Sequence, residues 1–153
     1  GHGLPVAVGL ALAAKKSNSS RRIFLITGDG ELAEGSNWEA ALAAAHYGLD
    51  NLIIINDKNN LQLAGPTREI MNTDPLADKW KAFGMTVTEC QGNDMASVVA
   101  TLEGLKQEGK PNVVIANTTK GAGISFIQGR PEWHHRVPKG EEIALALEEL
   151  KDE

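Results

Sequence analysis

Short β-branched runs alternate with longer helical patterns along most of this chain, and this alternation constrains the fold more than any other feature. The runs at 22–27, 52–56, 85–90 and 112–117 are typical of strands, and glycine or proline separates them from the helical patterns. Strands that alternate with helices form βαβ units, in which the strands are parallel. The sequence therefore predicts an α/β fold with a parallel sheet flanked by helices.

The helical patterns carry further expectations about packing. Helices are predicted at 4–16, 36–47, 75–83, 95–107 and 141–151, and an irregular segment at 118–139. The pattern from Ser36 to Glu39 is that of a capping box, which would open the second helix. Small alanine side chains on that helix would permit close approach of another chain, with Trp38 either as an interface anchor or as an ordinary core residue.

Composition excludes several classes of protein. The chain has 153 residues, of which 42% are hydrophobic, so a single folded domain is expected. Its net charge is −5 and its 15 basic residues are scattered, so neither nucleic acid nor an anionic membrane surface is an expected partner. The one cysteine, Cys90, is expected to pack inside. With no long apolar run or signal peptide, we expect a cytoplasmic protein.

Polar side chains follow two consecutive predicted strands. Asp29 comes after the first, between Gly28 and Gly30, and Asn59 comes after the second. Parallel strands would bring both loops to the same carboxyl edge of the sheet, where open α/β folds bind ligands. A carboxylate, an amide oxygen and a nearby carbonyl suit Mg²⁺, which fills its remaining positions with phosphate and water oxygens. The alternative is that these are ordinary turn residues.

These residues belong to a longer pattern that resembles the thiamine diphosphate motif of transketolases. The resemblance is carried by Gly28-Asp29-Gly30-Glu31, Glu34-Gly35, Trp38-Glu39-Ala40 and Asp50-Asn51-Leu52 leading to Asn59. Pyruvate dehydrogenase-type E1 α chains and deoxyxylulose phosphate synthases share the bare motif. The wider context is most similar to the N-terminal subunit of a split transketolase, in which two chains make the enzyme.

The resemblance implies a set of binding residues. Asp29, Asn59 and the carbonyl of Leu61 would hold Mg²⁺ or Ca²⁺, and the Gly30 N–H would donate to the diphosphate of the cofactor. Leu63 would lie against the cofactor rings or, alternatively, would be a core leucine. The residues that would bind thiamine diphosphate are Gly3, Gly28, Asp29, Gly30, Glu31, Asn59, Leu61, Leu63, Lys120 and His134.

Two residues would take part in catalysis. Alignment on Trp133 makes His134 the active-site histidine of the family, whereas counting back from Pro138 selects His135. We prefer His134, since a neutral imidazole near the reacting carbon is suited to proton transfer. Glu34 matches an acidic residue that the family places beside the cofactor at an interface.

The resemblance also implies an activity and a partner. Residues 1–153 would form the diphosphate- and metal-binding domain, with the front of the family domain missing. The reaction would transfer a two-carbon ketol group between sugar phosphates. A C-terminal transketolase subunit would supply the pyrimidine-binding domain, in a dimer or heterotetramer. The alternatives are another thiamine diphosphate enzyme, of the E1 α or deoxyxylulose phosphate synthase type, and a truncated non-catalytic module that binds a partner.

Overall fold

Four parallel strands form the centre of the fold, in the order β1-β2-β6-β5. The computed structural model describes residues 1–151. The strands of this sheet are β1 (Ile23–Gly28), β2 (Leu52–Lys58), β5 (Thr86–Gln91) and β6 (Asn112–Asn117). A separate antiparallel pair is made by β3 (Leu61–Gln62) and β4 (Gly65–Pro66). The predicted α/β fold with a parallel sheet is confirmed.

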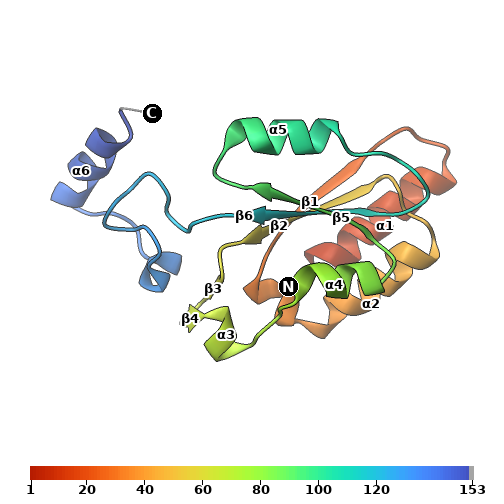
Figure 1. Ribbon diagram of the computed structural model, residues 1–153, viewed down its shortest axis with the longest axis horizontal. Helices are drawn as coiled ribbons and strands as arrows, with labels where there is room; N and C mark the ends of the chain where they lie inside the picture. Colours follow the sequence, from red (N-terminus) through yellow and green to blue (C-terminus); the bar gives the residue numbers. More distant parts are fainter. Residues whose placement is uncertain (152–153) are drawn as a thin grey trace.

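Helices cover both faces of the sheet (Figure 1). One face packs against α1 (Gly3–Lys16), α2 (Gly35–His46) and α4 (Leu76–Ala82), and the other against α5 (Met95–Glu103). The remaining helices are α3 (Thr67–Ile70) and α6 (Glu141–Glu149), with 3₁₀ turns η1 (Gly30–Ala33) and η2 (Pro131–His134). Cys90 is buried beneath α5, as its predicted packing role requires. Within residues 1–151, no helix is long and apolar enough to cross a membrane.

The position of each strand explains its composition. β2 and β6 lie in the middle of the sheet, and their apolar runs are buried almost throughout, as expected for strands covered on both faces. β1 lies at an edge and leaves Phe24 and Ile26 exposed. The carboxyl end of β2 therefore lies between the ends of β1 and β6.

Strand register brings the chemically important loops together. Gly28 of β1 pairs with Asp57 of β2, and Lys58 pairs with Asn117 of β6. The loops that follow these three strands thus leave the sheet side by side. The expectation that the Asp29 and Asn59 loops emerge at one edge is confirmed.

The predicted capping box is wrong. Helix α2 begins at Gly35, with Glu34 in the N-cap position and no side-chain cap. Ser36 is therefore inside the first turn rather than at the cap, and its buried Oγ has no hydrogen-bond partner among the described residues. Glu39 is exposed. The helix starts one residue too early for Ser36 to act as its N-cap.

The small side chains of α2 are used inside this chain. Ala40, Ala41 and Ala44 are buried in the core shared with α1. Trp38 packs against Trp80, with ring centroids 5.0 Å apart, and its Nε1–H donates to the Leu32 carbonyl at 2.9 Å. The core reading of Trp38 is therefore the one that the structure supports, and the alanine face is not free to receive another chain.

Candidate metal and cofactor site

A cleft of about 630 Å³ opens at the carboxyl edge of the sheet, above the ends of β1 and β2. All but one of the residues predicted to bind the cofactor line it, namely Gly28, Asp29, Gly30, Glu31, Asn59, Leu61, Leu63, Lys120 and His134. Gly3, the exception, begins α1 close to Glu31. Residues that are far apart in the sequence are thus brought to one place by the order of the strands.

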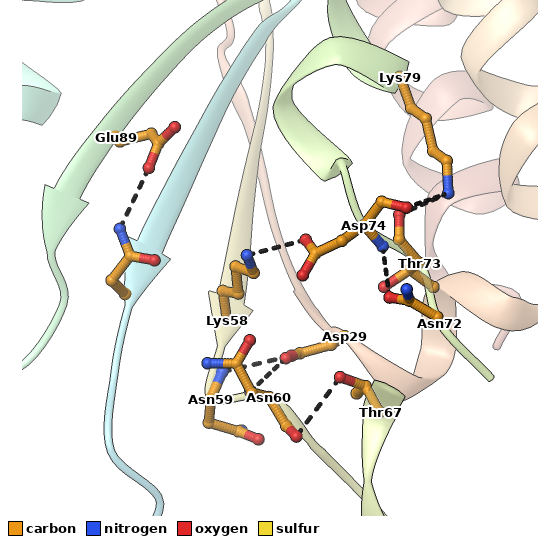
Figure 2. Close-up of polar contacts among 11 residues, drawn as sticks. Asp29, Lys58, Asn59, Asn60, Thr67, Asn72, Thr73, Asp74, Lys79 and Glu89 are labelled. Atoms are coloured by element: carbon orange, nitrogen blue, oxygen red, sulfur yellow. Dashed lines mark hydrogen bonds and ion pairs between the residues drawn. The ribbon is translucent and has the colours of Figure 1, made fainter. Parts of the chain in front are cut away.

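Asp29 is the buried acidic group of the cleft, with only 2% of its surface exposed. Figure 2 shows its carboxylate directed at the loop after β2. Oδ1 accepts the Asn59 N–H at 3.3 Å, and Oδ2 accepts the Asn60 N–H at 2.5 Å. Burial raises the pKa of Asp29 above its usual value, against the opposing effect of these hydrogen bonds, and the nearby Asp57 adds to the rise. A cation beside Asp29 would stabilise its charged form.

Asn59 presents its amide in a fixed orientation. Its Nδ2 donates to Asp57 Oδ2 at 3.2 Å, and its Oδ1 accepts the Leu61 N–H at 2.9 Å. An amide oxygen has two acceptor positions, so Oδ1 keeps one for a metal. Over residues 1–151, no three His, Cys, Asp or Glu side chains gather as a metal cluster. The donor set therefore fits Mg²⁺ or Ca²⁺ completed by diphosphate and water oxygens.

The turn that carries Asn59 is held on both sides. Asn60 adopts a left-handed conformation, with φ of 61°, and its carbonyl accepts the Thr67 N–H at 2.9 Å. Lys58 forms an ion pair of 2.9 Å with Asp74 on the segment before α4 (Figure 2). Asn and Asp tolerate the left-handed region better than most residues. The loop is thus positioned by short-range contacts before any ligand binds.

Comparison with known proteins decides the family. A family model described as "Transketolase, thiamine diphosphate binding domain" matches residues 1–151. The chain belongs to the transketolase family. An apulose-4-phosphate transketolase subunit of Actinobacillus succinogenes is 76% identical to it, over 100% of this chain and 55% of that protein.

Other transketolase relatives extend the comparison. A 6-deoxy-6-sulfo-D-fructose transketolase subunit of a Clostridium species is 40% identical, over 100% of this chain and 56% of its own length. The crystal structure of Campylobacter jejuni transketolase superposes with a TM-score of 0.91 at 33% identity, covering 97% of this chain and 24% of that one. The chain thus spans about half the length of the curated subunits it matches, and its predicted resemblance to the N-terminal subunit of a split transketolase is confirmed.

In this transketolase chain, two histidines lie at different places around the cleft. His134 ends the η2 turn and lines the cleft, whereas His135 follows it and is absent from the lining. Their rings meet edge to face at 4.5 Å. Trp133 is buried against Phe126 and lies under the guanidinium of Arg136, which fixes the turn that presents His134.

The remaining predicted residues differ in exposure. Leu63 is 63% exposed and lines the cleft, so it is not a core leucine. Lys120 lines the cleft from the loop after β6. Glu34 is exposed and lies outside the cleft lining.

Sequence reasoning missed two residues of the cleft, Asp57 and Gln62. Asp57 ends the buried run of β2 beside Asn59, and a carboxylate at that position was the available signal. No sequence signal pointed to Gln62. Its role is steric, because a Cβ added to Gly30 would lie 2.9 Å from Gln62 Cγ.

Gly30→Ala is therefore expected to weaken thiamine diphosphate binding and to lower thermal stability. The added methyl group must displace Gln62, and overpacking of this kind costs about 1–3 kcal/mol. Gly35→Ala is the matched control, because a Cβ there meets no atom within 4 Å. Calorimetric titration with cofactor and Mg²⁺, together with thermal unfolding, measures both effects. Wild-type affinity in Gly30→Ala would contradict the close approach.

Proposed function

We propose that this chain holds the diphosphate and a divalent metal of thiamine diphosphate for a transketolase reaction. The observation that carries the proposal is the convergence of Asp29 and Asn59 at one edge of the parallel sheet, in a cleft that also receives His134. The whole chain would serve as this one domain. The reaction would transfer a two-carbon ketol group between sugar phosphates.

Each side chain of the cleft has a distinct proposed role. Asp29, Asn59 Oδ1 and the Leu61 carbonyl would coordinate Mg²⁺ or Ca²⁺, and the Gly30 N–H would donate to the diphosphate. Thiamine diphosphate, when bound, supplies stabilisation of a carbanion next to the substrate carbonyl. The exposed apolar surface of Leu63 suits contact with the cofactor rings.

The other groups of the cleft would act on the substrate. His134 would exchange a proton with substrate oxygen through an imidazole nitrogen. Lys120 would offset phosphate charge. Glu34, which is exposed beside α2, would contact the cofactor only across an interface between two chains.

The substrate and partner follow from the same proposal. One relative is named for apulose 4-phosphate, so this ketose phosphate is the first donor to test. A C-terminal subunit with the pyrimidine-binding domain would complete the site, as a dimer or heterotetramer, because relatives of this chain are named as single subunits of a transketolase rather than as whole enzymes.

The experiment uses the full-length protein that contains this chain, first by itself and then titrated with its C-terminal subunit. Ketol transfer and cofactor binding are measured together, with apulose 4-phosphate or xylulose 5-phosphate as donor and pyruvate as the alternative. We expect ketol transfer only with both subunits. Robust transfer by the protein alone would refute the shared site. Turnover of pyruvate alone would identify another thiamine diphosphate enzyme, and a complex that binds no cofactor would identify a non-catalytic module.

A further inference from the structure

Asp57 is an acidic residue of the cleft to which the roles above assign nothing. It lies on central strand β2, where the register places it between Gly28 of β1 and Ala116 of β6. It lines the same cleft as Asn59. Both of its carboxylate oxygens accept hydrogen bonds from neighbouring side chains: Oδ2 accepts from Asn59 Nδ2 at 3.2 Å, and Oδ1 from the Thr118 hydroxyl.

These contacts select one of the two orientations of the Asn59 amide. A carboxylate accepts hydrogen bonds and donates none, so Asp57 must face the NH₂ group of Asn59 rather than its oxygen. The oxygen is then directed to the opposite side, where it accepts the Leu61 N–H at 2.9 Å. If the amide rotated by half a turn, its NH₂ group would occupy the position from which a cation must be coordinated.

Thr118 holds Asp57 in place from a third element. It is the first residue after β6, and its backbone N–H donates to the Lys58 carbonyl at 3.1 Å. Its hydroxyl donates to Asp57 at the same junction. The chain of contacts from Thr118 through Asp57 to Asn59 therefore links the loop after β6 to the loop after β2.

We infer that Asp57 is a positioning residue that turns the Asn59 amide oxygen toward the divalent metal, and that Thr118 holds Asp57 in that orientation. This inference rests on the proposed metal role of Asn59. Groups that orient metal ligands commonly contribute about 10–100-fold to metal affinity. Asp57 acts through Asn59 and makes no contact of its own with the metal.

The test is a double-mutant cycle in the full-length protein assembled with its C-terminal partner. Mg²⁺ is titrated by calorimetry in the presence of thiamine diphosphate. Asp57→Ala is expected to weaken Mg²⁺ binding by about 10–100-fold in the wild-type background, as loss of an orienting group does, and to have little further effect when Asn59 is already alanine. Asp57→Asn is expected to retain most of the affinity, because its Oδ1 can accept from Asn59 while its NH₂ faces the Thr118 hydroxyl.

The outcomes separate this inference from the proposed function. If Asn59→Ala alone leaves Mg²⁺ binding unchanged, the proposed metal site is wrong and the inference is wrong with it. If Asn59→Ala weakens binding but the Asp57→Ala loss persists undiminished beside it, Asp57 acts on its own and only the inference is overturned. Thr118→Val keeps the side-chain shape and gives the same cycle should Asp57→Ala fail to fold. Asp94→Ala, which removes a carboxylate that caps α5 outside the cleft, is the control and should bind Mg²⁺ as the wild type does.

Discussion

Asp29→Ala is expected to reduce the affinity for thiamine diphosphate and Mg²⁺ by more than about 100-fold, beyond the usual effect of losing a residue that only orients a ligand. Asp29 is the proposed anionic ligand of the metal. Its loss would leave diphosphate charge uncompensated in a largely buried corner of the cleft. Calorimetric titration of the assembled enzyme with cofactor, at saturating Mg²⁺, measures the effect.

Asp29→Asn separates binding from folding. The amide keeps an oxygen that can accept the Asn59 and Asn60 N–H groups, but it carries no charge. Burial raises the pKa of Asp29 in the folded state, so ionised Asp29 costs folding stability once the pH exceeds the pKa of the unfolded chain. We therefore expect Asp29→Asn to unfold at the same or a higher temperature than the wild type while losing cofactor affinity. Unchanged affinity in both Asp29 variants would refute the metal assignment.

His134→Ala is expected to lower kcat by about 100-fold or more, the usual contribution of a positioned acid or base, with little change in cofactor affinity. A group that acts on the reacting carbon contributes chiefly in the transition state. His134 lines the cleft from the end of η2. Steady-state kinetics with the ketose phosphate donor, beside a cofactor titration, separates the two quantities.

His135→Ala is the matched control for this prediction. It removes the same side chain one residue further on, outside the cleft lining. The loss of kcat should be much smaller. If His135→Ala is the more damaging change, the alignment that counts back from Pro138 is right and the preference for His134 is wrong.

Most of the fold follows from the apolar runs and their punctuation. The bounds of β6, Asn112–Asn117, are those predicted, because a wholly apolar run bordered by asparagine leaves little ambiguity. The predicted end of α5 is wrong: the helix stops at Glu103, where Gly104 follows, and not at residue 107. Glycine disfavours helix, so the first glycine rather than the later one ends it. Local patterns fix the type of an element better than its ends.

The candidate site was predictable as far as strand order alone could reach. A parallel pair of consecutive strands places Asp29 and Asn59 at one edge whatever the side chains do. The link from Asp57 to Thr118 depends on β6 lying next to β2, across 61 residues of sequence, and on the direction of individual side chains. Hydrophobic periodicity contains no information about either, so the second layer of the site needed the structure.

The central position of β2 has a consequence for how the protein is made. One partner of this strand, β1, precedes it on the ribosome, but the other, β6, ends at Asn117, 59 residues after Lys58. At elongation rates of about 5–20 residues per second, one side of an isoleucine-rich strand waits roughly 3–12 s for its partner. Thr118 emerges only after β6, so the nascent chain cannot complete the Asp57 contact earlier. Cofactor binding is therefore expected to report completion of the sheet and to give the newborn chain no protection against aggregation before that point.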